Sequence, residues 1–347
     1  MDYTKVIPLL EKAIEFYATD IHLVVGHPPI FRIHGELVAS NMNPLKEDEL
    51  FQTIFNMMTD SQRHVFLEKQ DMDLSYLGVK NFNFRVNACI EKGSPAANIR
   101  ILPTKIPNAQ QLGLPPIIDK IARKRSGFVI ICGPAGSGKT TTMNYMVDLI
   151  NRERAAKIVM IEDPIEYVHE SKKSLIIQRE VNSHTQSFGS ALKHALRQDP
   201  DVVVIGEVRD AESITMALTT AETGHLVLTT LHARDTVETI NRILDIYPPG
   251  KHNQIRTQMA ENLICIVGQI LVPLQGTKGR TLVTEVLIPN LAIRNIIRRG
   301  ALLEVRGQMV AGEEGTYTFE QYLTDLIDKK VITKEYAREF AKFPALL

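Results

Sequence analysis

Several features are scarce in this sequence of 347 residues, and each scarcity narrows what the protein can be. The chain carries no net charge, because 40 Lys and Arg residues balance 40 Asp and Glu residues. Nucleic-acid binding usually needs a basic surface, so we expect no nucleic-acid partner, although this balance leaves room for a local basic patch. The three cysteines lie far apart without a C-x-x-C pair, so we expect neither a disulfide framework nor a zinc site.

Long hydrophobic runs are also lacking. No stretch approaches the roughly 20 apolar residues that are needed to span a bilayer. Met1–Asp20 carries charges throughout and lacks the apolar centre of a signal peptide. We therefore expect a cytoplasmic protein.

The length favours two domains, because single cores usually stop growing at roughly 250–300 residues. The clearest break is Pro103–Pro116, where four prolines and a glycine interrupt periodic structure. We expect an N-terminal domain at residues 1–103, a linker at 104–116 and a second domain at 117–347.

The residues before this break indicate a small α+β domain. Three segments show the alternation of strands, and one longer stretch between them is typical of a helix. The expected strands are Ile21–Val25, Ile30–Ile33 and Phe82–Ala88, and the expected helix is Glu47–Leu67.

After the break the pattern changes to buried apolar runs, each followed by a helical stretch, which predicts an α/β fold with a parallel sheet. The runs are Phe128–Cys132, Ile158–Ile161, Val202–Ile205 and Leu226–Leu228. Ligands of open parallel sheets bind beyond the carboxyl ends of the strands, so the polar residues that follow these runs are the candidates for function.

The first run is followed by GPAGSGKT, which matches G-x-x-x-x-G-K-[ST] in full and precedes a predicted helix, Thr141–Ile150. Glycines let such a loop bend so that several N–H groups point at one phosphate, Lys139 reaches the β- and γ-phosphates, and the Thr140 hydroxyl binds Mg²⁺. The expected nucleotide-binding residues are Gly133, Pro134, Ala135, Gly136, Ser137, Gly138, Lys139, Thr140 and Thr141.

Acidic residues and histidines follow or flank the other strands. Hydrolysis needs an acidic partner for the metal, and Glu207 after Val202–Ile205 is well placed for it. A turn after Ile158–Ile161 contains three carboxylates, and the last strand has a histidine at each end. These residues are Glu162, Asp163 and Glu166, and His225 and His232.

In this order the four motifs resemble those of the secretion ATPase superfamily, which drives type II and type IV secretion and type IV pili. There they are called Walker A, Asp box, atypical Walker B and His box. The resemblance covers almost the whole chain, beginning at Ala18–Leu37. The string A-I-R-N-x-I-R within Leu291–Gly300, the lack of a four-cysteine zinc element and the short N-terminal region resemble the PilT-like branch, the pilus retraction ATPases.

This resemblance implies a RecA-like P-loop motor domain with a PAS-like N-terminal domain, assembled as a homohexamer. It implies that Glu166 polarises the attacking water with Glu162 close behind it, and that Glu207 holds Mg²⁺. His232 and His225 would sense the γ-phosphate or line the subunit contact. Arg85 and Arg100 match the arginines that the N-terminal domain brings to the phosphates. Arg197 and Arg209 are weaker candidates.

Leu291–Gly300 is also predicted to be a helix from its residues. Asn290 is a good start, Gly300 a good stop, and apolar residues recur at helical spacing. Arg294 and Arg298 then lie one turn apart, which is unfavourable for like charges on an ordinary surface, although a solvated basic face is the alternative. The resemblance makes this helix necessary for retraction and not for hydrolysis. The residues concerned are Ala292, Ile293, Arg294, Asn295, Ile297 and Arg298.

We therefore expect an ATP- and Mg²⁺-dependent motor that powers pilus retraction and twitching motility. It would work at the inner face of the cytoplasmic membrane with an inner-membrane platform protein and, as a further expected partner, a paralogous retraction ATPase. The alternatives are an assembly or type II secretion ATPase, a RecA-like nucleic-acid motor, and a regulator that binds nucleotide without hydrolysis. The last part of the chain, Thr316–Leu347, departs from the usual ending of the PilT-like branch and is somewhat like that of PilU-like paralogues.

Overall fold

The computed structural model describes residues 6–33, 35–79, 82–102, 105–276, 279–312 and 315–347, and it divides the chain into two compact units. Unit 1 comprises Met1–Ile106, Glu162–His169 and Gln178–Ser187, and unit 2 comprises Pro107–Ile161, Glu170–Ile177 and Phe188–Leu347. The expected boundary between residues 103 and 104 lies outside the described residues.

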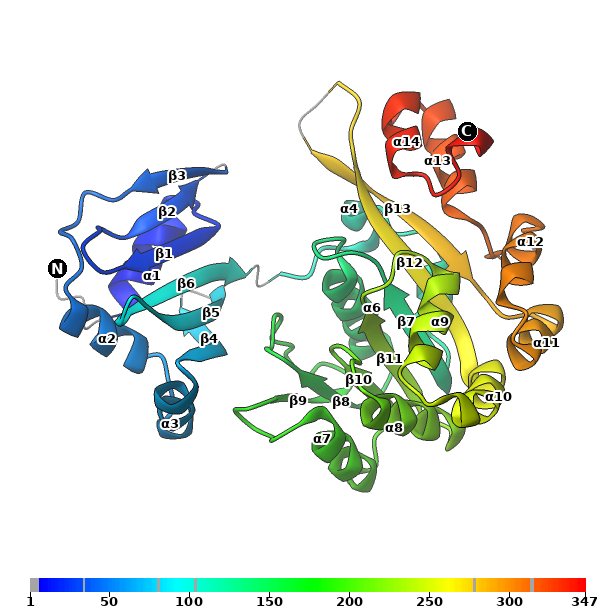
Figure 1. Cartoon of the computed structure of the whole chain (residues 1–347), viewed down its shortest axis with the longest axis horizontal. Coiled ribbons are helices and arrows are strands. Elements are labelled where there is room, and N and C mark those ends of the chain that lie inside the picture. Colours follow the sequence, from blue (N-terminus) through cyan, green and yellow to red (C-terminus); the bar gives the residue numbers. More distant parts are fainter. Residues whose placement is uncertain (1–5, 34, 80–81, 103–104, 277–278, 313–314) are drawn as a thin grey trace. The chain divides into compact units, whose positions relative to one another are not determined.

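Unit 1 contains a six-stranded sheet in the order β3-β2-β1-β6-β5-β4 (Figure 1). Each pair of neighbouring strands in this sheet is antiparallel. Its core is built from apolar side chains of the sheet and the helices, including Leu10, Ile21, Leu50 and Phe84, none of which is exposed to solvent. The strands are β1 Asp20–Val24, β2 Ile30–Ile33, β3 Glu36–Ala39, β4 Asp71–Val79, β5 Phe82–Glu91 and β6 Ser94–Leu102, and the helices are α1 Val6–Glu15, α2 Glu47–Phe55 and α3 Asp60–Lys69.

The expectation of one helix over Glu47–Leu67 is wrong, because α2 ends at Phe55 and α3 begins at Asp60. Thr59 lies between them in an extended conformation and caps α3. Its hydroxyl accepts a hydrogen bond from the Gln62 amide at 3.3 Å, and the Gln62 side chain accepts one from the Thr59 amide at 2.9 Å. This reciprocal capping box satisfies amides that would otherwise have no partner at the start of α3, so it favours a new helix over a continuous one.

Unit 2 is built around a seven-stranded sheet in the order β13-β12-β7-β11-β10-β8-β9 (Figure 1). The five strands from β12 to β8 run parallel, and β13 is antiparallel to β12. Every residue of β7, β10 and β11 is buried, as expected for a parallel sheet that is covered on both faces. The predicted α/β fold is confirmed. The strands are β7 Gly127–Cys132, β8 Lys157–Glu162, β9 Leu175–Glu180, β10 Val202–Ile205, β11 Leu226–Leu231, β12 Leu263–Pro273 and β13 Arg280–Leu287.

Helices of unit 2 lie between the strands along the chain, and four more, α11 to α14, come after the last strand. Its α-helices are α4 Ala109–Leu112, α5 Ile117–Ala122, α6 Lys139–Glu153, α7 Phe188–Ala195, α8 Ala211–Glu222, α9 Thr236–Asp245, α10 His252–Asn262, α11 Leu291–Arg299, α12 Val305–Val310, α13 Phe319–Asp328 and α14 Lys334–Phe340. Short 3-10 helices are η1 Leu196–Gln198, η2 Pro249–Lys251, η3 Leu302–Glu304 and η5 Pro344–Leu346. Helix α4 lies within the stretch that we expect to be a linker. Across the described residues, every helix is too short or too polar to span a bilayer.

Candidate functional site

A tight glycine-containing loop joins the end of β7 to the start of α6. Gly133 has a φ of +154°, and a Cβ at this position would lie 2.3 Å from the carbonyl oxygen of Gln269 on β12, so only glycine fits against that strand. Gly138 has a φ of +89° and occupies the N-cap of α6 in the left-handed region, which glycine adopts at no steric cost. The loop therefore ends at a helix N-terminus, whose free amides and positive dipole form an anion-binding site.

Lys139 is the first residue of α6, and its side chain turns back over the loop. The residue is only 7% exposed, and its ammonium group donates to the carbonyl oxygens of Gly133 at 3.0 Å and Pro134 at 2.9 Å. The Ser137 hydroxyl is buried in the same loop, and its oxygen has no hydrogen-bond partner among the described residues. A buried cation beside an unsatisfied hydroxyl at a helix N-terminus fits a phosphate group.

The next two strands along the sheet from β7, which are β11 and then β10, bring further polar groups to this edge. Glu207 follows β10 and His232 follows β11, which extends three residues beyond its expected end. The His232 ring lies 3.4 Å from the Lys139 ammonium through Nδ1 and 3.6 Å from the Glu207 carboxylate through Nε2. Unit 2 therefore brings Lys139, Glu207 and His232 together.

The charges around His232 act on its protonation in opposite directions. Burial lowers the pKa of His232, and the positive charge of Lys139 lowers it further, whereas Glu207 raises it. The net direction is downward, so the imidazole is neutral at neutral pH. The other carboxylate oxygen of Glu207 is paired with Arg209 at 2.7 Å. The second weaker arginine candidate, Arg197, lies on η1.

His225 lies at the opposite end of β11. Its carbonyl oxygen accepts a hydrogen bond from Gly127, the first residue of β7, whereas the phosphate loop follows the last residue of that strand. Its ring nitrogen Nδ1 lies 3.0 Å from both the Thr220 carbonyl oxygen and the Thr223 hydroxyl. Six residues of strand span roughly 20 Å, so within one chain His225 is not brought to the phosphate loop.

Glu162, the last residue of β8, and Glu166 in the turn that follows it differ in their surroundings. Glu162 is 2% exposed, and its Oε1 accepts a hydrogen bond from Gln178 at 2.9 Å. Burial raises the pKa of Glu162 to about 8, and the neighbouring Glu166 and Glu180 contribute in the same direction. Glu166 is more accessible, with 29% of its side chain exposed, and lies 3.9 Å from Arg85. Glu166 is therefore the carboxylate of this pair that is open to solvent.

Arg85 and Arg100 lie directly opposite each other on β5 and β6, so both side chains start from one face of the sheet in unit 1. Arg100 donates to Asp20 at 2.9 Å. Burial of Asp20 acts to raise its pKa, but the hydrogen bonds from Arg100 and Thr19 outweigh this and hold the pKa below its usual range. The two arginine side chains remain substantially exposed, at 40% for Arg85 and 60% for Arg100, so they stay accessible to an anion.

Sequence patterns missed a buried carboxylate, Glu180 at the end of β9, that holds the turn carrying Glu166. Glu180 is 2% exposed and accepts hydrogen bonds from the Ile165 amide at 3.0 Å and the Ser183 hydroxyl at 2.7 Å. It also accepts from the hydroxyl and amide of Ser75 on β4. Its only signal in the sequence is that it shares a strand face with Gln178, two residues earlier.

Helix α11 has the predicted ends. Asn290 caps its start by accepting a hydrogen bond from the Ile293 amide at 2.9 Å, and Gly300 ends it in the left-handed region. Its apolar stripe is buried. Arg294, however, donates to the carbonyl group of Glu261 near the end of α10 and to that of Leu263, the first residue of β12, at 3.1 Å each. The alternative of a solvated basic face therefore does not hold for Arg294.

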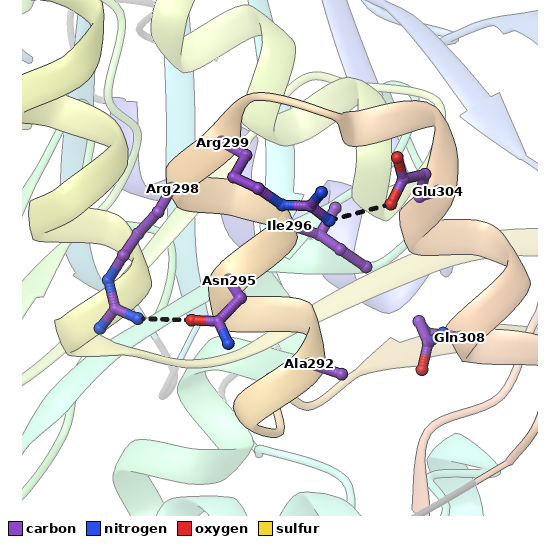
Figure 2. A pocket seen from close by; sticks show the side chains of 7 residues that line it. All are labelled: Ala292, Asn295, Ile296, Arg298, Arg299, Glu304 and Gln308. Carbon is purple, nitrogen blue, oxygen red and sulfur yellow. Dashed lines mark hydrogen bonds and ion pairs between the residues drawn. The ribbon is translucent and has the colours of Figure 1, made fainter.

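The exposed side of α11 borders a pocket of about 600 Å³ that continues over η3 and α12 (Figure 2). Arg298 is hydrogen-bonded to Asn295 at 3.0 Å, and Arg299 is paired with Glu304 at 3.1 Å. Leu291 on α11 is 73% exposed, and Leu303 on η3 is 97% exposed. The pocket is lined by Ala292, Asn295, Ile296, Arg298, Arg299, Glu304 and Gln308.

Comparison with known proteins gives consistent likenesses over nearly the whole chain. The family model described as Type II/IV secretion system protein matches residues 4–338. The chain is 40% identical over 315 residues to the "Twitching motility protein" of Neisseria gonorrhoeae, covering 90% of this chain and 84% of that protein. It is 38% identical over 345 residues to the "Type IV pilus retractation ATPase PilT" of Pseudomonas aeruginosa, covering 99% of each.

A solved structure agrees with these likenesses. The crystal structure of the pilus retraction motor PilT with bound ADP matches with a TM-score of 0.91 at 40% identity, covering 99% of this chain and 98% of that chain.

Proposed function

The chain belongs to the type II/IV secretion system protein family, and from this premise we propose that it is the ATPase motor that powers type IV pilus retraction. The activity is hydrolysis of ATP to ADP and phosphate. One observation carries the proposal: the buried Lys139 ammonium at the start of α6 lies within 3.4 Å of His232, which in turn contacts Glu207. A nucleotide-binding loop is thereby joined to the groups that a hydrolase needs.

In this proposal the phosphate loop binds the triphosphate through backbone amides, and Lys139 exchanges its loop carbonyl partners for phosphate oxygens. The Thr140 hydroxyl and the Glu207 carboxylate would hold Mg²⁺, which neutralises charge on the phosphates when it is bound. His232 is neutral, so its ring can donate to an anion through one nitrogen and accept through the other. The buried hydroxyl of Ser137 supports this assignment, because a phosphate oxygen would satisfy it.

The remaining roles follow from exposure and charge. We assign Glu166 as the carboxylate that polarises the attacking water, because Glu162 is buried and carries a proton at neutral pH. Arg85 and Arg100 stabilise the charge that develops on the transferred phosphoryl group, and their exposure supports this role. His225, at the far end of β11, is assigned to the subunit contact.

The working form that we propose is a homohexamer at the inner face of the cytoplasmic membrane. Its load would be an inner-membrane platform protein, with a paralogous retraction ATPase as a further partner. The surface of α11 and its pocket is the proposed contact with that load. The exposed Leu291 and Leu303 and the basic rim support a partner with an apolar and acidic surface.

The activity is tested by phosphate release from the purified protein with Mg-ATP. We expect release from the wild type and a loss of at least about a hundredfold in Lys139→Ala, because the phosphates lose their cation in a site where charge stabilisation is the main source of rate. A matched control is Lys120→Ala on α5, a lysine outside the phosphate loop. A wild type that binds nucleotide without releasing phosphate would contradict the proposal and favour a regulator.

A strain that lacks the gene tests whether the motor retracts pili or assembles them. Loss of a retraction motor leaves long or numerous pili, because assembly continues unopposed. Loss of an assembly or secretion ATPase leaves no pili and would contradict the proposal. Complementation with the Lys139→Ala chain is expected to leave the long-pilus phenotype unchanged.

A further inference from the structure

The last part of the chain, Thr316–Leu347, contributes to a buried cluster of charge in unit 2. We call this the α9 clamp. Its three carboxyl groups are almost fully buried: Asp235 is 3% exposed, Glu285 is 1% exposed and Glu320 is 3% exposed. Buried carboxylates are costly unless they are paired, so each needs specific partners. The clamp consists of Asp235, Glu285, Arg306, Glu320, Lys342 and Phe343.

Two of these carboxylates hold the amino end of α9. Asp235 is the N-cap and accepts a hydrogen bond from the Glu238 amide at 2.7 Å, while its second oxygen is paired with Lys342. Glu285 on β13 accepts from both the amide and the hydroxyl of Thr236, at 2.9 Å and 2.8 Å. These bonds satisfy amides at the start of α9 that have no partner within the helix, so they fix where α9 begins.

Arg306 connects the clamp to the last part of the chain. Its guanidinium is paired with Glu320 on α13, lies 3.8 Å from Glu285, and stacks 4.3 Å from the ring centroid of Phe343. Glu320 also accepts a hydrogen bond from the Phe343 amide at 3.0 Å. Helices α12 and α13 and the segment after α14 therefore meet at one point, next to the start of α9.

The start of α9 also determines the position of His232. Only Ala233 and Arg234 separate His232 from the N-cap Asp235. Arg242 of α9 donates to the His232 carbonyl oxygen, and the Arg234 amide donates to Glu238 of the same helix at 3.2 Å. A shift of the amino end of α9 would therefore move the ring that contacts Lys139 and Glu207.

We propose that Arg306 and Lys342 position the amino end of α9, and through it His232, for ATP hydrolysis. This inference rests on the proposed function of the same site. Arg306 lies on α12, and Gln308 of that helix lines the α11 pocket (Figure 2), so the clamp also joins the proposed load-bearing surface to the phosphate site. Arg306 and Lys342 are positioning residues, since neither contacts the phosphate loop in the described residues.

The test is a double-mutant cycle on the full chain, using Lys342→Met and His232→Ala. Lys342 is half exposed, and Asp235 keeps its bond to the Glu238 amide without it, so the variant is expected to fold. We expect Lys342→Met to lower kcat about fivefold with the KM for ATP changed less than about twofold. Lys342→Arg should restore kcat, because it keeps the charge at Asp235.

The decisive measurement is single-turnover hydrolysis, which resolves the slow rates of the His232→Ala background. If Lys342 acts through His232, then adding Lys342→Met to His232→Ala changes the rate less than about twofold. A further fivefold loss in that background would show that Lys342 acts independently of His232 and would overturn the inference.

A control and the wild type separate this inference from the proposed function. Lys329→Met removes an exposed ion pair with Asp325 on α13, outside the clamp, and is expected to leave kcat unchanged. If the wild type hydrolyses ATP and Lys342→Met has the same kcat, or lowers only the melting temperature, the clamp is structural and the inference fails. If the wild type does not hydrolyse ATP, the proposed function fails first.

Discussion

Glu162 shows how the folded structure changes the chemistry of a single carboxyl group. Its pKa is raised by burial from 4.5 to about 8, so the folded chain keeps a proton that the unfolded chain has already lost at neutral pH. Stability from this group is therefore fully present below about pH 4.5 and is lost as the pH rises towards 8. The slope approaches roughly 1.4 kcal/mol per pH unit within this window.

We predict that Glu162→Gln removes this loss, because glutamine has the same shape as the protonated acid and can still accept the hydrogen bond from Gln178. The variant should match the wild type near pH 5 and exceed it in free energy of unfolding by about 2 kcal/mol or more at pH 8. Urea unfolding at both pH values measures this difference. Parallel stability curves for the two proteins would show that Glu162 titrates normally.

At the same scale, the phosphate loop was predictable residue by residue, because its chemistry depends on local spacing. Lys139 is six residues from Gly133 and bonds its carbonyl oxygen. Glu180 was not predictable, because its partner Ser75 is 105 residues away in the sequence. A glutamate at the end of an ordinary strand gains this full set of partners only when the chain has folded.

At the scale of elements, α11 illustrates how a correct helix can carry a wrong side-chain assignment. Its ends depend on Asn290 and Gly300, which act on their own helix, so the sequence indicates them. Arg294 instead bonds the final carbonyl groups of α10, and the fate of those groups depends on how the two helices pack. At α2 and α3 the helix ends themselves were predicted wrongly, because a capping box at Thr59 starts a new helix where the helical spacing of the residues is continuous.

We predict that Arg294→Ala and Arg298→Ala differ in stability. Arg294→Ala leaves carbonyl groups of α10 without their charged donor and should lower the free energy of unfolding by about 2 kcal/mol. Arg298 is exposed, and its ion pair with Glu261 spans 4.0 Å, so Arg298→Ala should cost less than about 0.5 kcal/mol. Thermal unfolding of the two purified variants measures the difference.

This prediction also decides how a motility phenotype is interpreted. Loss of retraction in Arg298→Ala at normal stability would support the α11 pocket as the contact with the load. Loss in Arg294→Ala alone would be explained by a displaced helix. Equal melting temperatures for the two variants would contradict the capping role of Arg294.

At the scale of the whole chain, the division into units cannot be deduced from composition alone. A proline-rich stretch marks a boundary in chain order, whereas the structure assigns Glu162–His169 and Gln178–Ser187 to unit 1. Contacts such as the hydrogen bond from Gln62 to Ser183 at 2.8 Å join these segments to the rest of unit 1. Strands β12 and β13 were likewise missed, because they carry no motif and their pairing follows from the finished sheet.

The proposed homohexamer predicts that two neighbouring subunits share one nucleotide site. If Arg85 and Arg100 serve the nucleotide of a neighbouring subunit, two inactive chains can complement each other. One chain carries Lys139→Ala, and the other carries Arg85→Ala with Arg100→Ala. After mixing and reassembly in equal amounts, about a quarter of the sites combine an intact lysine with intact arginines from a neighbour, because each requirement is met by half of the subunits.

The mixture should therefore recover hydrolysis up to roughly that fraction of the wild-type rate, while each variant alone stays inactive. Size-exclusion chromatography checks that each variant forms the same assembly, and ADP binding checks that the arginine variant keeps its phosphate loop. No recovery from correctly assembled mixtures would place the arginines on the nucleotide of their own chain. That outcome would leave the ATPase assignment unchanged and remove the shared site as the reason why the motor must be a ring.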